Sequence, residues 1–184
     1  MNDIFFEILR PGINTTLQDT GRNNLYHIGV TVSGAMDQRN YKIANALVGN
    51  SINNAAIEFA YQGPLLKLKN GSLNIAVTGN INFNIIKNNK EVQKGNCYQN
   101  YVLNDEDQID IISTEKSVYG YIAVGGIFDV EKIWNSYSIN TKASIGPNNG
   151  KKYSENEKIF IKNLSTKFYT YRKINYKTSV NSTL

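Results

Sequence analysis

Residues 73–87, LNIAVTGNINFNIIK, decide the fold class of this chain. Two runs rich in apolar and β-branched residues flank Gly79-Asn80, a pair typical of a tight turn. Similar runs recur on both sides of this stretch, at 4–9, 55–60, 64–69, 97–103, 108–113, 118–125 and 158–163. Runs spaced by roughly 8 to 12 residues and separated by Gly, Asn and Asp predict an all-β, mainly antiparallel sandwich or barrel.

One segment departs from this strand pattern. Residues 37–50 read DQRNYKIANALVGN, and their apolar side chains recur at helical spacing on one face. Asp37 can accept the free amide hydrogens of a first helical turn, and Gly49 can end a helix because it adopts positive φ at little cost. We therefore predict a helix over about 38–48, and a second, shorter helical turn at 129–134, which also begins with an Asp.

Composition limits the class of protein. The chain has 184 residues, of which 41% are hydrophobic and 19% charged, so we expect a folded domain with a sizeable core. A single cysteine, Cys97, excludes an internal disulfide and a cysteine-cluster metal site, and it is interpreted as a core residue. A single histidine, His27, excludes any site that needs two imidazoles. We expect no bound metal.

Location and partners follow from the same features. No apolar run approaches the ~20 residues of a membrane-spanning helix. The first residues carry Asp3 and Glu7 where a secretory signal needs positive charge, so we expect a cytoplasmic protein. The net charge of +5 is a weak indication of an anionic partner, and basic residues are scattered. We expect no membrane and no nucleic-acid partner.

The chain divides into two parts. Residues 1–163 contain all the strong strand signals and are interpreted as one β domain. Residues 164–184 are basic and rich in tyrosine, and we interpret them as a terminal strand followed by a frayed tail.

Chemically capable residues are densest between 15 and 37. A glycine-rich polar stretch before a helix suits a binding loop, since glycines let the backbone approach a ligand. The alternative is that these glycines only shape turns and that Asp37 only caps. His27 is the natural single acid or base, because an imidazole exchanges protons near neutral pH, although a lone histidine is often structural. Glu58 lies between apolar neighbours, where a carboxylate needs partners unless alternation places it on a wet face.

Several blocks together resemble one known family. They are 8–22, 27–37 with Ser33-Gly34-Ala35-Met36-Asp37 at its end, 44–50, 55–68, 75–79 and 121–127. In order and spacing they resemble the family of the C-type subunit of 5-oxoprolinase, also called biotin-dependent carboxyltransferase or allophanate hydrolase subunit 2. The resemblance covers about residues 4–162.

The resemblance implies half of a paired cyclophilin-like β-barrel that works with a sister subunit of related fold and a third subunit. The complex would open 5-oxoproline to glutamate with ATP as cofactor. It also implies the site residues. The catalytic ones would be His27, Asp37 and Glu58; the substrate-binding ones would be Gln18, Asp19, Arg22, Ser33, Gly34, Asn45, Thr78 and Gly79.

Two departures from the family pattern keep other functions open. The second half of the pattern is absent, so we expect a truncated member, or one completed by a separate polypeptide. Where the family has Gly-Ser-Arg-Ser, this chain has Asn135-Ser136-Tyr137-Ser138, so an anion-binding arginine is replaced by Tyr137. The alternatives are a non-catalytic module that pairs with a sister subunit, as in members that antagonise a kinase inhibitor, and carboxyl transfer from biotin in a urea carboxylase system. A degraded relic is the remaining interpretation.

Overall fold

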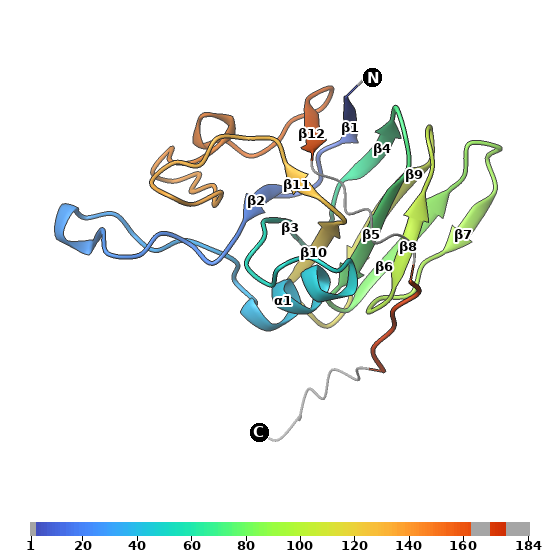
Figure 1. Cartoon of the computed structure of the whole chain (residues 1–184), viewed down its shortest axis with the longest axis horizontal. Helices are drawn as coiled ribbons and strands as arrows, with labels where there is room; N and C mark the ends of the chain where they lie inside the picture. Colours follow the sequence, from blue (N-terminus) through green and yellow to red (C-terminus); the bar gives the residue numbers. More distant parts are fainter. Residues whose placement is uncertain (1–2, 163–169, 176–184) are drawn as a thin grey trace.

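The computed structural model describes residues 3–162 and 170–175, which form two antiparallel sheets around one core with a helix outside (Figure 1). This confirms the predicted fold class. The strands are β1 Ile4–Arg10, β2 Thr16–Gln18, β3 Ala56–Ala60, β4 Leu65–Lys69, β5 Leu73–Thr78, β6 Ile81–Ile86, β7 Val92–Lys94, β8 Asn100–Leu103, β9 Gln108–Thr114, β10 Tyr119–Val124, β11 Ile127–Phe128 and β12 Lys158–Lys162; the helices are η1 Tyr26–Ile28, α1 Gln38–Leu47 and η2 Asn148–Gly150.

The two sheets enclose the main core between them. The larger sheet has the order β11-β12-β1-β4-β9-β6-β7, and the smaller has the order β2-β3-β10-β5-β8. Alternate side chains of both sheets point inward, and Phe6, Leu66 and Phe83 of one sheet belong to the same buried cluster as Ile57 and Ile122 of the other. Strand pairing among the described residues gives two facing sheets rather than one closed ring.

Helix α1 covers the outer face of the five-stranded sheet (Figure 1). As predicted, it begins after Asp37, whose carboxylate accepts hydrogen bonds from the backbone N–H groups of Arg39 and Asn40 at 3.1 and 3.0 Å. Its buried face packs on small residues of the sheet, which let the helix approach closely. The cluster comprises Tyr41, Ala44 and Leu47 of the helix, Ala35 and Val48 on either side of it, and Ala56, Ala76, Ala123 and the larger Tyr121 of the sheet.

The second predicted helical turn, at 129–134, is wrong. The backbone N–H of Asp129 donates to the carbonyl of Phe160 at 2.8 Å, which continues the β11–β12 pairing. Residues 133–136 then form a tight turn in which Trp134 and Asn135 both have positive φ. Strand pairing with a distant segment therefore overrides the local helix signal. Strands β2, β7 and β11 were not predicted either, because they are too short to show a hydrophobic run.

Part of the predicted C-terminal tail is described. Asn100 N–H donates to the carbonyl of Arg172, and Ile174 N–H donates to that of Tyr98, at 3.1 and 2.9 Å. The Arg172 guanidinium also donates to the carbonyl of Ala46, at the C-terminal end of α1. Residues 170–175 thus lie beside the start of β8. The rest of the predicted tail, 163–169 and 176–184, lies outside the described residues, so the domain boundary stays a prediction.

Candidate functional site

A row of polar residues crosses the face of the five-stranded sheet on which α1 packs. The strand register places Thr16 opposite Glu58, Glu58 opposite Tyr121, and Tyr121 opposite Thr78. All four side chains are buried, and Glu58 is only 3% exposed, so it does not lie on a wet face. Since a buried polar group is costly without hydrogen bonds, the partners of this row define what it can do.

Glu58 is held through one of its two carboxyl oxygens. Its Oε2 accepts a hydrogen bond from the Met36 backbone N–H at 2.8 Å and another from the Tyr121 hydroxyl at 2.7 Å. Burial raises the pKa of Glu58, with a smaller contribution from nearby Asp37, and this outweighs the two hydrogen bonds, which lower it. Glu58 is therefore set to keep its proton where an ordinary glutamate has lost it.

Glu58 lines a cavity of about 240 Å³ between the sheet edge, the segment before α1 and the loop after β11. This volume lies below the ~300–1,000 Å³ of sites for drug-sized ligands, so it suits a small molecule. The lining residues are Asn14, Gln18, Thr31, Ser33, Gly34, Met36, Glu58, Tyr119, Ile139, Asn140, Thr141 and Lys142. The cavity thus brings together Gln18, Ser33, Gly34 and Glu58 from the predicted site.

Gln18, one of the residues that line this cavity, has an unpaired acceptor. Its Nε2 donates to the Thr16 hydroxyl at 2.9 Å and to the Ile139 carbonyl at 2.8 Å. Because a carbonyl can only accept, these bonds fix which end of the amide is the oxygen. Gln18 Oε1 is buried without a hydrogen-bond partner among the described residues. Because Gln18 and Glu58 line the same cavity, this orphaned oxygen is a candidate acceptor for a ligand N–H group.

The Ser33-Gly34 turn forms one wall of the cavity. Gly34 has a φ of +92°, and an added Cβ would lie 3.0 Å from the backbone of Gly21 and Thr20, so this position requires glycine. The Ser33 hydroxyl accepts a hydrogen bond from Asn140 Nδ2 at 3.2 Å. The turn is therefore packed against the backbone that follows β2 and is tied to the loop after β11.

Asp19 fastens the loop after β11 to the end of β2. Its Oδ1 accepts hydrogen bonds from the hydroxyls of Ser136 and Ser138 at 2.7 and 2.6 Å and from the N–H of Gly21 at 2.8 Å. Its Oδ2 accepts from the N–H of Tyr137 at 2.7 Å. The Asp19 carboxylate thus accepts four hydrogen bonds, all of which hold the cavity wall in place. The two serines come from the block in which the family arginine is replaced by Tyr137.

Arg22 is buried next to this anchor. Its guanidinium donates to the Ser138 carbonyl, while Nε and Nη1 have no partner among the described residues. Burial lowers the pKa of Arg22, against the attraction of Asp19, which raises it. Arg22 therefore supports the loop from inside and does not line the cavity.

The other predicted site residues lie apart from the cavity. His27 is exposed within η1, on an arm that Figure 1 shows directed away from the sheets. Both oxygens of the Asp37 carboxylate are used at the start of α1. Thr78 donates to the Asn40 carbonyl at 2.8 Å, and Asn45 donates to the Asn54 carbonyl at 2.8 Å. Gly79 forms the turn after β5, with a φ of +110°. The catalytic and substrate-binding roles assigned to these residues stay predictions.

Sequence reasoning missed most of the residues that line the cavity or hold its walls, and four of them, Tyr121, Ser136, Ser138 and Lys142, show why. Tyr121 lies in an apolar strand, where a tyrosine is indistinguishable from a core residue. Ser136 and Ser138 contact Asp19 although more than 100 residues separate them in the sequence. Only the alternating serines of residues 135–138, the block that differs from the family pattern, could have indicated them. Lys142 has no motif around it and could not have been found.

Neither a metal centre nor a membrane span is evident in the described part of the chain. Residues 3–162 and 170–175 contain no group of three or more His, Cys, Asp or Glu side chains placed to hold a metal ion. Within the same residues, no helix has the length and apolar character needed to cross a membrane.

Residues 28–182 match the family described as carboxyltransferase domain, subdomain A and B. The chain belongs to this family, which confirms the resemblance in the sequence. Among its relatives, urea amidolyase of Lachancea kluyveri is 31% identical over 162 residues, covering 85% of this chain and 8% of that protein. The C-type subunit of 5-oxoprolinase from Haemophilus influenzae is 31% identical over 140 residues, covering 76% of this chain and 44% of that protein.

A solved structure agrees with these relatives. The crystal structure of the K. lactis urea amidolyase superposes with a TM-score of 0.80 at 27% identity, over 88% of this chain and 10% of that one. The chain spans less than half the length of either curated relative described above.

Proposed function

We propose that this chain is a subunit of an ATP-dependent 5-oxoprolinase-like complex and holds 5-oxoproline while its lactam is opened to glutamate. One observation carries the proposal. The cavity pairs an unpaired acceptor, Gln18 Oε1, with a carboxyl group, Glu58, whose environment favours the neutral form. The name of the Haemophilus influenzae relative, which is a 5-oxoprolinase subunit, supports the same substrate.

The chemistry of a lactam matches this pair. A lactam ring presents its N–H and C=O groups along one edge, and a cavity with one acceptor and one donor satisfies both. Gln18 Oε1 would accept from the N–H, and neutral Glu58 would donate to the carbonyl oxygen. In the reaction water adds its oxygen to the carbonyl carbon, the C–N bond breaks, and the nitrogen gains a proton. An acid at this position stabilises the charge that develops on the carbonyl oxygen.

ATP does not fit this cavity. A volume of about 240 Å³ suits a small amide and is too small for a nucleoside triphosphate. The sequence also lacks a Gly-x-x-x-x-Gly-Lys phosphate loop. We therefore assign the ATP chemistry to the sister subunit and the third subunit.

Carboxyl transfer to urea is the second candidate. Urea amidolyase matches 85% of this chain, against 76% for the 5-oxoprolinase relative. Urea also carries N–H and C=O groups on one edge, so the same donor and acceptor would serve it. In that reaction a biotin carrier on another polypeptide would bring the carboxyl group.

The test is reconstitution with a sister subunit and the third 5-oxoprolinase subunit, measuring ATP-dependent glutamate release from 5-oxoproline. Glu58→Gln should lower kcat by about a hundredfold or more, because glutamine keeps the donor but cannot transfer a proton. KM should change less than about threefold. The matched control is Glu131→Gln, an exposed glutamate outside the cavity, which should leave both constants unchanged.

Three outcomes would overturn the proposal. Full activity in Glu58→Gln would remove Glu58 from the reaction. A stable complex that releases no glutamate but carboxylates urea when a biotin carboxylase and carrier are added would favour the second candidate. A stable complex inactive in both assays would favour a non-catalytic module.

A further inference from the structure

Tyr121 connects the start of α1 to Glu58 by hydrogen bonds of fixed direction. The backbone N–H of Asp37 donates to the Tyr121 hydroxyl oxygen at 2.7 Å. A backbone N–H can only donate, so at this contact the hydroxyl accepts. Its single hydrogen is then directed at Glu58 Oε2, also at 2.7 Å. The direction of the whole chain, from Asp37 through Tyr121 to Glu58, is set by the backbone.

This direction decides which oxygen of Glu58 carries the proton. Oε2 accepts from both Tyr121 and Met36, so a proton on Oε2 would have to displace one of them. Oε1 receives no hydrogen bond from the described residues, and Glu58 lines the cavity. We propose that Tyr121 is a positioning residue that fixes the proton of neutral Glu58 on Oε1, from which it is presented to the lactam.

Burial and ring packing hold Tyr121 in a fixed position. Its side chain is fully buried, and its ring packs edge-on against Tyr41 at a centroid distance of 6.3 Å. Burial raises the pKa of Tyr121, with Glu58 adding to the effect, so the hydroxyl remains a donor. The packing sets the position of the hydroxyl, and the Asp37 amide sets its orientation. Both are in place before any ligand binds.

Among the described residues, no cation pairs with Glu58 in place of the proton on Oε1. A single cation lines the same cavity, Lys142, and the described residues show no ion pair between it and Glu58. The titratable and charged groups that face Glu58 from the elements packed around it are Tyr121 and Tyr119 of β10, Asp37 at the start of α1, and Lys142 in the loop after β11.

Infrared spectroscopy of the isolated chain tests the positioning without requiring turnover. With glutamate labelled by ¹³C, the C=O band of a neutral carboxyl group should persist in the wild-type chain as the pH rises above the ordinary glutamate pKa of 4.5, where exposed glutamates lose this band. Glu58→Gln should abolish this band and so assign it. In Tyr121→Phe the band should move to higher frequency, since the carbonyl oxygen Oε2 then accepts one hydrogen bond in place of two.

Tyr41→Phe is the matched control. It also removes a buried hydroxyl, which donates to the Asn54 carbonyl at 2.7 Å rather than to Glu58, so the band should not move. An unmoved band in Tyr121→Phe, or no neutral-carboxyl band in the wild type, would overturn the proposal. A band that moves equally in both variants would also overturn it, because it would report loosened packing only.

Turnover in the reconstituted complex tests the consequence, which rests on the proposed function. Tyr121→Phe should lower kcat about tenfold with little change in KM, because substrate contacts remain but the acid is less well oriented. The hydroxyl lowers the pKa of Glu58, so its loss should move the alkaline fall in activity to higher pH. If Glu58→Gln is inactive but Tyr121→Phe has the wild-type kcat and pH profile, the proposed function stands and the positioning role fails.

Discussion

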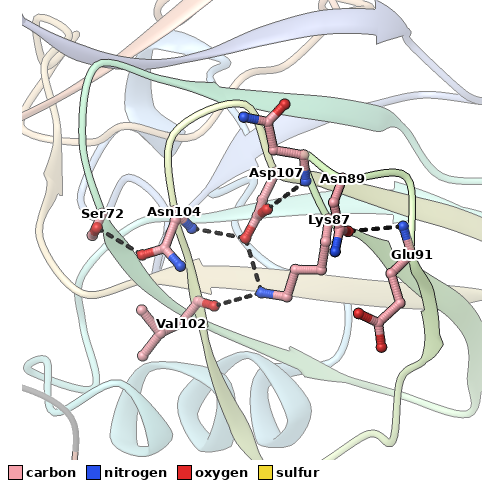
Figure 2. A network of polar contacts seen from close by, with 8 residues as sticks. Ser72, Lys87, Asn89, Glu91, Val102, Asn104 and Asp107 are labelled. Carbon is pink, nitrogen blue, oxygen red and sulfur yellow. Dashed lines mark hydrogen bonds and ion pairs between the residues drawn. The ribbon is translucent and has the colours of Figure 1, made fainter.

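Two buried carboxyl groups of this protein, Asp107 and Glu58, differ in the charge of their partners. Asp107 is 2% exposed and Glu58 is 3% exposed, so burial does not distinguish them. Asp107 accepts from the Lys87 ammonium at 2.8 Å and from the backbone N–H groups of Asn88 and Asn104 at 3.0 and 2.9 Å (Figure 2). Among the described residues, Glu58 has one backbone N–H and one tyrosine hydroxyl as partners, and no cation.

This difference moves the two pKa values in opposite directions. Burial opposes the ionisation of Asp107, but its hydrogen bonds from Asn104, Lys87 and Asn88 together outweigh burial and lower its pKa. At Glu58 burial prevails and the pKa is raised. The ion pair of Asp107 fastens the turn between β8 and β9 to the end of β6 (Figure 2). A buried carboxyl group without a counter-cation is instead a candidate for chemistry.

Isosteric substitution at the two sites should have the largest and most unequal effect. Asp107→Asn should lower the free energy of unfolding by about 3 kcal/mol, because Lys87 loses its counter-charge and one donor loses its acceptor. Glu58→Gln should cost less than about 1 kcal/mol, because the amide oxygen accepts both hydrogen bonds and the NH₂ group takes the place of the protonated oxygen. Urea denaturation monitored by circular dichroism measures both.

The double variant Lys87→Met with Asp107→Asn provides the control. If the ion pair carries the cost, the double variant should recover at least about 1 kcal/mol relative to additivity. Equal losses at Asp107 and Glu58 would remove the distinction drawn between the two sites.

The pH dependence of stability should separate the same two groups. The pKa of Glu58 in the folded chain lies above its ordinary 4.5. Its contribution to the free energy of unfolding is therefore complete below pH 4.5 and is lost as the pH rises through the folded-state pKa. The folded-state pKa of Asp107 lies below its ordinary 3.8, so its contribution is complete above that pH and is lost as pH falls. Each slope is at most about 1.4 kcal/mol per pH unit.

Urea denaturation between about pH 3 and 8 tests these signs, within the range where the folded chain is stable. Glu58→Gln should reduce the decline in the free energy of unfolding above pH 4.5. Asp107→Asn should reduce the loss of that free energy at acid pH. A Glu58→Gln variant with the wild-type slope above pH 4.5 would show that Glu58 is ionised in the folded chain.

The sequence predicted what local patterns determine. Helix α1 followed from Asp37 and the spacing of Tyr41 and Leu47, because capping and amphipathic periodicity act within a few residues. Glu58 was recognisable because a carboxylate among apolar neighbours needs partners. The identity of those partners was not recognisable, since Tyr121 becomes adjacent to Glu58 only through strand register.

The missing information is long-range. His27 was suited to catalysis by its chemistry, but it is exposed on an arm directed away from the sheets (Figure 1) and does not line the cavity. Asp19 was expected to line the site, yet its oxygens are occupied by Ser136, Tyr137 and Ser138. Such contacts depend on where two loops meet, which no local pattern encodes.

Asp19 completes the comparison, because its direct hydrogen-bond donors are hydroxyl and backbone N–H groups, while the Arg22 guanidinium attracts it without a hydrogen bond among the described residues. If several neutral donors share the stabilisation, loss of any one should be tolerated better than loss of a counter-ion. Ser138→Ala removes one donor to Asp19 Oδ1 and the acceptor of the Asp19 backbone N–H, and it leaves the donors Ser136, Tyr137 and Gly21. The free energy of unfolding should therefore fall by only about 1 kcal/mol.

The control for Ser138→Ala is Ser154→Ala, at an exposed serine whose hydroxyl makes no hydrogen bond with the described residues, and its stability should be unchanged. A loss in Ser138→Ala as large as in Asp107→Asn would contradict shared stabilisation. It would mean that the Ser138 hydroxyl alone keeps Asp19 solvated, and that the cavity wall formed by Ile139 and Asn140 depends on that one hydrogen bond. Gln18 Nε2 donates to the Ile139 carbonyl of that wall at 2.8 Å, so the same variant should then also weaken substrate binding in the reconstituted complex.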